Sequence, residues 1–212
     1  MIERVVILGG GGHAKVVADI LEEMAELEIE GYFAPQPRPD GLYGYRWLGP
    51  DASLEESPAA GVRSAFVAIG DNRRRMDCLE FLKRRGFRLI NAVSPRAVIS
   101  RHAKLGQGVA VMPGAVINAG TQVGDGAIVN TNASVDHDCV IGACAHIAPG
   151  VALAGCVSVG EGAFLGVGSS VIPGITIGPW TTVGAGGVVV ADLPGSVLAL
   201  GVPATIRRRT GG

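Results

Sequence analysis

An aliphatic residue recurs at every sixth position through the second half of the chain. Residues 97 to 192 divide into 16 hexads without an insertion, and the third place of every hexad is Ile, Leu or Val. A period of six matches neither an α-helix nor a flat strand. It is typical of a parallel β-helix with a triangular cross-section, in which three hexads make one coil of 18 residues. We therefore predict a β-helix of about five coils.

The other hexad places agree with this architecture. The first place is mostly small, which fits a corner where strands converge, and Gly or Asn recur at the corners, where a tight turn needs positive φ. Aromatic residues make up only 5% of the chain, as a narrow interior filled by small aliphatic side chains would require.

The first half of the chain has a different pattern, in which apolar segments alternate with amphipathic ones. Helical spacing occurs at 13–24 and at 73–86, where Gly86 would end the second helix. Apolar segments that predict buried strands lie between and around these helices, at 4–8, 29–33, 64–69 and 87–93. This order predicts a parallel α/β sheet. Residues 34–51, rich in Pro and Gly, are expected to form a loop.

These two patterns define two domains, which we place at 1–94 (Rossmann-like) and 95–212 (β-helix with a short C-terminal tail). The net charge of −1 gives no electrostatic case for a nucleic-acid or membrane partner. The four cysteines lack zinc-site spacing, so we expect reduced thiols in a cytoplasmic protein. The start of the chain does not resemble a signal peptide, and we expect no membrane span.

The stretch GGGGHA, residues 9–14, lies where the first strand meets the first helix. Backbone N–H groups at a helix N-terminus face an anion, and Gly lets a phosphate approach closely. His13 at the helix start and Gly70 at the end of a later strand would border the same crevice. The alternative is a Gly-rich turn with packing demands. Because no acid follows the second strand before Asp40, the pattern disfavours NAD.

His137 and Asp138 stand together at a predicted corner of the β-helix. One coil away on either side, the place of His137 is taken by Ala119 and by Gly155, so the imidazole would lie beside open backbone. A carboxylate next to an imidazole fixes its tautomer and raises its basicity, which suits a general base. The alternative is a solvated polar corner without catalytic function.

The histidines of the β-helix raise the possibility of a metal site. Trimeric β-helix carbonic anhydrases use three His residues, two of them spaced H-x4-H, whereas His102, His137 and His146 show no such spacing. We therefore expect no metal.

The hexads, together with GGGGHAK, NTNASVDHDCVIG and the terminal GVPATIRR, resemble the left-handed β-helix acyltransferases that carry an N-terminal Rossmann-like domain. This family contains sialic acid O-acetyltransferases and nucleotide-linked 4-amino-sugar N-acetyltransferases. The chain looks most similar to the N-acetyltransferases that act on UDP-4-amino sugars and on GDP-perosamine. The resemblance implies acetyl-CoA as co-substrate and a homotrimer, with each CoA groove between adjacent β-helices.

The resemblance also implies roles for individual residues. His137 matches the proposed proton acceptor for the sugar amine, and Asp138 matches the acid beside it. Contact with acetyl-CoA is implied for His146, Gly155, Val167 and Ala185, and contact with the nucleotide for Gly11, Gly12, His13 and Gly70.

Two departures from the family pattern concern the nucleotide and the acidic residue beside His137. UDP-sugar members often carry an Asp pair where this chain has the substrate-binding positions Phe33 and Ala34, so GDP is a reasonable alternative to UDP as the nucleotide. Asp138 replaces the Glu of some members, so it could orient His137 differently.

The leading hypothesis is an enzyme that moves acetyl from acetyl-CoA to the C4 amine of a nucleotide-linked 4-amino-4,6-dideoxy sugar, with GDP, UDP or dTDP as the nucleotide. The alternatives are a sugar O-acetyltransferase of the sialic acid type and a trimeric scaffold without catalysis. The terminal RRRTGG could approach the CoA phosphates, but we expect a frayed basic tail.

Overall fold

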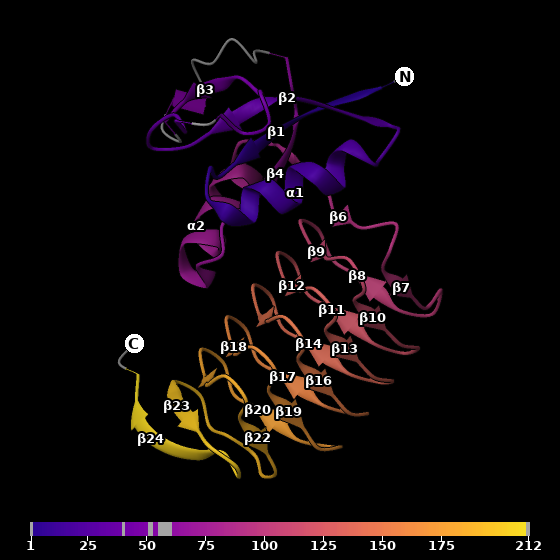
Figure 1. Cartoon of the computed structure of the whole chain (residues 1–212), viewed down its shortest axis with the longest axis vertical. Coiled ribbons are helices and arrows are strands. Elements are labelled where there is room, and N and C mark those ends of the chain that lie inside the picture. The colour runs from indigo at the N-terminus through magenta and orange to yellow at the C-terminus, as the bar shows by residue number, and fades with distance from the viewer. Residues whose placement is uncertain (1, 40, 51–52, 55–60, 211–212) are drawn as a thin grey trace. The chain divides into compact units, whose positions relative to one another are not determined.

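The computed structural model describes residues 2–39, 41–50, 53–54 and 61–210. The chain divides into two compact units, Met1–Pro95 and Arg96–Gly212. Each unit is built on parallel strands. In the first unit they form one open sheet, and in the second they form the three faces of a solenoid (Figure 1). Within the described residues, no helix is both long enough and apolar enough to span a bilayer.

The first unit contains a five-stranded parallel sheet in the order β3-β2-β1-β4-β5. The chain leaves β1 toward β2 on one side and reaches β4 on the other, so the strand order reverses beside β1. In open α/β sheets this switch point creates a crevice at the carboxyl ends of the strands. The elements are β1 (Glu3–Leu8), α1 (Gly12–Glu22), β2 (Leu27–Phe33), β3 (Trp47–Gly49), β4 (Ser64–Val67), α2 (Asn72–Arg84), β5 (Arg88–Leu89) and β6 (Ala92–Val93).

The core of this unit follows from the apolar runs. Val5, Val6, Ile7 and Leu8 of β1 are each at most 1% exposed, because a central parallel strand is covered on both faces. Helix α1 buries one apolar stripe, as its 3.6-residue spacing predicts.

Two local predictions for this unit were wrong. The 34–51 segment is not all loop, because Trp47–Gly49 forms β3 beside β2, with Tyr32 N–H donating to the Arg46 carbonyl at 3.0 Å. A three-residue strand is too short for a periodic signal. Segment 87–93 forms two short strands instead of one. Asp40 and Asp51 lie outside the described residues.

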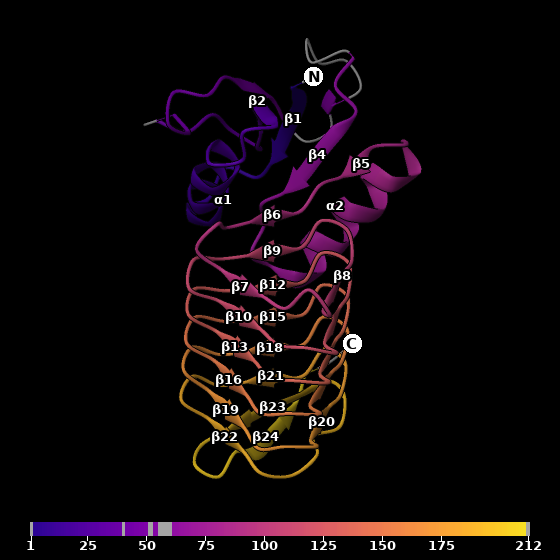
Figure 2. The ribbon, with the colours of Figure 1, turned by 90° about the vertical axis from the view of Figure 1, so that its right-hand side faces the viewer.

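The second unit is a parallel β-solenoid, which confirms the main prediction from the hexads. Strands 18 residues apart pair in parallel, as Ile117 does with Val135, and Figure 2 shows the strands stacked as rungs. Three sheets result, one on each face: β22-β19-β16-β13-β10-β7, β20-β17-β14-β11-β8, and a third that contains β23-β21-β18-β15-β12-β9. The strands are β7 (Val98–Ile99), β8 (Lys104–Leu105), β9 (Ala110–Val111), β10 (Val116–Ile117), β11 (Gln122–Val123), β12 (Ile128–Val129), β13 (Ser134–Val135), β14 (Val140–Ile141), β15 (His146–Ile147), β16 (Ala152–Leu153), β17 (Ser158–Val159), β18 (Phe164–Leu165), β19 (Ser170–Val171), β20 (Thr176–Ile177), β21 (Thr182–Val183) and β22 (Val188–Val189).

Hexad places have fixed structural roles in the solenoid. The third-place aliphatic residues are buried from Val111 to Val189, and only the first two, Ile99 and Leu105, are half-buried. Every sixth place from Gly108 to Gly186 has positive φ, as the corner turns were predicted to require. Most of these sixth places are Gly, and the others are Asn132, Asp138, Cys144, Cys156 and Trp180.

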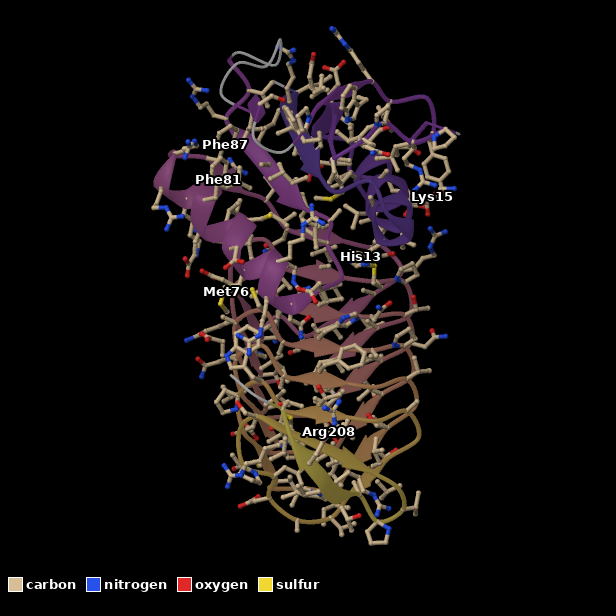
Figure 3. All side chains as sticks on the ribbon, turned by 90° about the vertical axis from the view of Figure 1, so that its left-hand side faces the viewer. His13, Lys15, Met76, Phe81, Phe87 and Arg208 are labelled. Carbon is tan, nitrogen blue, oxygen red and sulfur yellow. The ribbon has the colours of Figure 1, made fainter. Side chains whose placement is uncertain are left out.

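The solenoid continues beyond the hexads, so the count of about five coils understates its length. Strand β23 (Val197–Leu200) adds to the third sheet, and β24 (Thr205–Arg209) pairs with it in antiparallel fashion. The described part of the basic tail is therefore an ordered strand that carries Arg208 (Figure 3), and the prediction of a frayed tail was wrong. Backbone pairing holds β24, whose side chains are all exposed, and no apolar alternation could have predicted it.

Candidate functional site

The predicted His–Asp pair lies at the corner that follows β13. His137 Nδ1 is 2.9 Å from Asp138 Oδ2. The preceding residue also takes part, because Asp136 Oδ1 accepts a hydrogen bond from the His137 backbone N–H at 2.8 Å. Buried Thr121, from the preceding coil, donates its hydroxyl to the Asp136 carbonyl at 2.8 Å and accepts from the Cys139 N–H at 3.2 Å. These contacts hold the corner backbone in place.

Two carboxylates shape the electrostatics of this corner. The hydrogen bond to Asp138 raises the pKa of His137 above its ordinary 6.5, and the negative charge of Asp136 raises it further. The pKa of Asp136 is lowered, first by the His137 N–H and then by the Asn118 side chain, whose Nδ2 lies 3.0 Å from Asp136 Oδ1. Asp136 therefore stays ionised near neutral pH.

The contact with Asp138 determines the tautomer of the His137 imidazole. An ionised carboxylate only accepts hydrogen bonds, so neutral His137 donates from Nδ1 to Asp138 and keeps Nε2 as an acceptor. The two side chains are 58% and 64% exposed, which leaves the corner open to a reacting group. The arrangement suits a general base whose tautomer is set by its neighbour.

Glycines one coil away make room for both side chains. A Cβ built on Gly155 would lie 2.5 Å from His137 Cε1 and 2.6 Å from Nε2. On the other side, a Cβ on Gly120 would lie 2.3 Å from Asp138 Oδ1. Contacts under 3.0 Å are essentially never made by real Cβ atoms. The pair therefore fits because its two neighbours in the stack lack side chains. Gly155 stood out in the sequence as a small neighbour of His137, whereas Gly120 was missed.

His146 lies on another wall of the solenoid, in β15 of the third sheet. Its Nε2 is 3.0 Å from Asn130 Nδ2, and its ring meets Phe164 edge-on at 5.2 Å between centroids. Asn130 and Phe164 were not predicted. Both follow from the 18-residue register, since Phe164 is paired with His146 and Asn130 follows the strand on the other side.

The four predicted CoA-contacting residues do not cluster in one chain. Gly155 shares the corner of His137, between the first and second sheets. Val167 and Ala185 are exposed at the corner between the third and first sheets, where Gly186 N–H donates to the Val167 carbonyl at 2.9 Å. The sequence spacing explains this difference. Positions 137 and 155 are 18 residues apart, which is one full coil, so they share a corner. Positions 155 and 167 are 12 residues apart, which is two thirds of a coil, so they lie at different corners.

A second candidate site is a cavity of about 460 Å³ in the first unit. It lies at the switch point of the sheet and is lined by the Gly-rich turn, by the ends of β2 and β4, and by the start of α2. Its walls include Gly9, Gly10, Gly11, Gly12, His13, Ala34, Pro35, Gln36, Gly70 and Arg74. The structure thus brings together most of the residues predicted to hold the nucleotide.

The four glycines of the turn have two different functions. A Cβ on Gly9 would lie 2.5 Å from the Ala68 carbonyl oxygen, and one on Gly10 would lie 2.9 Å from Ala34 Cβ, so these two glycines allow close packing. A Cβ on Gly11 or Gly12 would meet nothing within 4 Å. Packing therefore accounts for Gly9 and Gly10, whereas the space beside Gly11 and Gly12 is open, as the predicted approach of a phosphate would require.

The start of α1 offers hydrogen-bond donors to this cavity. Its N-cap, Gly11, has no side chain to accept from the first turn, and no acidic residue lies in that turn. Burial and the nearby Arg75 charge lower the pKa of His13 to about 4, so its ring is neutral near pH 7. Its Nε2 is buried and finds no hydrogen-bond partner among the described residues.

Three arginines near the cavity were missed from the sequence. Arg75 is 1% exposed and donates to the carbonyls of Ile69 and Gly70 at 2.9 and 3.0 Å, which fixes the turn after β4. Arg74 lines the cavity, and Arg38 Nη1 donates to the Gly10 carbonyl. Arg74 and Arg75 lie in the helix predicted at 73–86, and their place just after a strand end was a signal for a site.

The two substrate-binding positions predicted at the end of β2 differ in placement. Ala34 lines the cavity, but Phe33 is fully buried in the core and does not line it. The Phe33 side chain therefore makes no wall of this cavity, and its place among the substrate-binding positions stays a prediction.

Known proteins match this chain over nearly its whole length. The family model described as the PglD N-terminal domain matches residues 4–82. PerB from Caulobacter crescentus, solved in complex with CoA and GDP-perosamine, is 52% identical, with a TM-score of 0.93 over 98% of this chain and 99% of that one. Variants of perosamine N-acetyltransferase from that organism, with a histidine replaced by Asn or Ala, were solved with the same ligands.

The acetyltransferase domain of PglB from Neisseria gonorrhoeae is also similar. It is 36% identical and covers 96% of this chain and 99% of that one, with a TM-score of 0.92. The same domain has been solved in complex with acetyl coenzyme A.

Proposed function

Because this chain belongs to the PglD-type hexapeptide-repeat β-helix N-acetyltransferases, we propose that it transfers acetyl from acetyl-CoA to the C4 amine of a nucleotide-linked 4-amino-4,6-dideoxy sugar. The observation that carries the chemistry is the His137–Asp138 pair, oriented at an open corner by Gly120 and Gly155. PerB, with its bound CoA and GDP-perosamine, makes GDP-perosamine the first candidate substrate.

The reaction needs one proton acceptor. The sugar amine attacks the thioester carbonyl carbon, the C–S bond breaks, and CoA leaves as a thiol. His137 Nε2 accepts the proton that the amine loses and gives it to the departing thiolate sulfur, and Asp138 holds the ring with Nδ1 as donor. Backbone N–H groups that line the CoA groove stabilise the oxyanion. No metal takes part in this proposed acetyl transfer.

We assign the nucleotide to the cavity of the first unit. The free space at Gly11 and Gly12 and the donors at the start of α1 suit a pyrophosphate, and Arg74 adds positive charge. His13 lines the same cavity with a neutral ring whose Nε2 has no hydrogen-bond partner among the described residues, which suits a hydrogen bond to a ligand. An alanine at position 34 lines the cavity and offers no carboxylate to the base.

The separation of the predicted CoA residues supports a homotrimer. Gly155 and the pair Val167 and Ala185 lie at different corners of one solenoid. Packing of one chain's first corner against a neighbour's second corner would bring both sets to one acetyl-CoA molecule, with His146 as a further contact. We also propose a cytoplasmic location, in keeping with four free cysteines.

The test is thiol release from acetyl-CoA with a panel of acceptors: GDP-, UDP- and dTDP-linked 4-amino sugars and free sialic acid. Release with GDP-perosamine is the expected result. Release with sialic acid alone would replace N-acetylation with O-acetylation. Absence of release across the panel would contradict the proposed substrate class.

A further inference from the structure

A third potential ligand group stands beside the His–Asp pair. Cys156 is an exposed free thiol. The ligand atoms of His137, Asp138 and Cys156 all lie within 4.8 Å of one another. The acetyl transfer described above makes no use of this thiol.

The solenoid register brings the thiol to this place. Cys156 comes 18 residues after Asp138, and both occupy the sixth place of their hexads, with φ of 61° and 59°. The Cys156 backbone N–H donates to the His137 carbonyl at 2.9 Å, so the two coils are tied together at the cluster itself. The relative positions of the three residues are thus set by the ladder and not by a mobile loop.

The three groups form a mixed nitrogen, oxygen and sulfur donor set. Imidazole, carboxylate and thiolate are the ligands of protein-bound Zn²⁺, whereas Mg²⁺ and Ca²⁺ prefer oxygen alone. Ligands around tetrahedral Zn²⁺ lie roughly 3.3–3.8 Å apart, given bond lengths of about 2.0–2.3 Å. Small rotations of three exposed side chains bring atoms within 4.8 Å to that spacing.

We propose that His137, Asp138 and Cys156 form an inhibitory site for Zn²⁺ or a similar thiophilic divalent cation. Binding replaces the thiol proton, which passes to solvent, with a metal–sulfur bond, and it occupies an imidazole nitrogen of His137. The fourth coordination position is left to water. A bound cation removes the proton acceptor of the reaction, so acetyl transfer stops until the cation is withdrawn.

The first experiment measures binding without any substrate, so its outcome does not depend on the proposed function. The full-length protein is titrated with Zn²⁺ alone against a chromophoric chelator. We expect one Zn²⁺ per chain, and affinity at least about tenfold weaker in Cys156→Gly, since even the loss of an outer-shell partner costs 10–100-fold. Gly is the commonest residue at the sixth place, so this variant keeps the turn. Cys78→Ser, in the first unit, is the matched control and should bind like wild type.

Two further readouts identify the ligands and the consequence. Cd²⁺ should give a thiolate charge-transfer band in wild type that Cys156→Gly lacks. Zn²⁺ should inhibit loss of the thioester absorbance in wild type, with recovery after EDTA, while Cys156→Gly retains its basal rate and resists inhibition. Equal Zn²⁺ affinity in wild type and Cys156→Gly, or no binding at micromolar Zn²⁺, would overturn the proposal.

Discussion

The Gly-rich turn of the first unit and the His–Asp corner of the second both depend on glycine, but in opposite ways. At the turn, a Cβ on Gly11 or Gly12 would enter open space that is available to a ligand. At the corner, a Cβ on Gly120 or Gly155 would enter space that Asp138 and His137 already fill. One set of glycines leaves room for a substrate, and the other leaves room for the protein's own reactive groups. Substitution by Ala should therefore affect binding in the first case and chemistry in the second.

The largest effect should come from the corner itself. His137→Ala is expected to lower kcat by roughly 10²–10⁴, because it removes the proton acceptor. Steady-state kinetics with the best acceptor of the panel measures this loss. His102→Ala is the matched control, since His102 is another exposed histidine of the solenoid, and it should retain full activity. A loss below about tenfold in His137→Ala would rule out a general base at this position.

Gly155→Ala tests the occupied space directly. Gly155 does not have positive φ, so the substitution acts only through its Cβ, which would displace the imidazole. We expect kcat to fall by about 10- to 100-fold, since a displacement of 1 Å in a reacting group can cost about that much. The variant should remain folded by circular dichroism. Wild-type kcat in the folded variant would show that the ring has room elsewhere.

Gly12→Ala tests the open space. Gly12 is the first residue of α1, so Ala should leave stability unchanged or raise it by up to about 1 kcal/mol. The new methyl group would meet nothing in the protein but would stand where a pyrophosphate is proposed. We expect KM for the sugar nucleotide to rise about tenfold with little change in kcat, because Gly lets the backbone approach the phosphates. An unchanged KM would place the nucleotide elsewhere.

Asp138→Asn should have the most subtle effect, on the pH profile. The hydrogen bond to Asp138 is the main cause of the raised pKa of His137, so its weakening lowers that pKa. His137 acts when neutral, and kcat/KM therefore rises with pH through its pKa. In Asp138→Asn the rising limb should move to lower pH, with a smaller loss of kcat than in His137→Ala. If the rising limb of the pH profile does not move, a group other than His137 is responsible for it.

The sequence contained enough information for most of the fold. An aliphatic residue at every sixth position predicts a parallel β-helix, and Gly at the corners allows the positive φ that its turns need. The Gly-rich turn between a strand and a helix likewise located the cavity. Strands β3 and β24 were not predictable in this way, because β3 has only three residues and every side chain of β24 is exposed, so neither shows an apolar alternation.

The candidate sites were predictable in part. His137, Asp138 and Gly155 share one corner, as their spacing implies. Arg75 was not foreseen as buried, because its burial depends on hydrogen bonds to the carbonyls of Ile69 and Gly70 and to Asn72 Oδ1, which the charge pattern of the helix does not reveal. The sequence spacing of Gly155 and Val167 was enough to predict that they lie at different corners. Both occupy the fifth place of a hexad, which suggested wrongly that they lie together.

The solenoid register also determines when the reactive corner can exist during folding. Each coil contacts only its neighbours, so stable structure can spread along the stack one coil at a time. The corner draws on three successive coils, represented by Gly120, His137 and Gly155. A nascent or partly unfolded chain that lacks any one of these coils cannot orient the imidazole, even if all its other coils are intact. Competence for acetyl transfer should therefore appear only once these three coils have formed together.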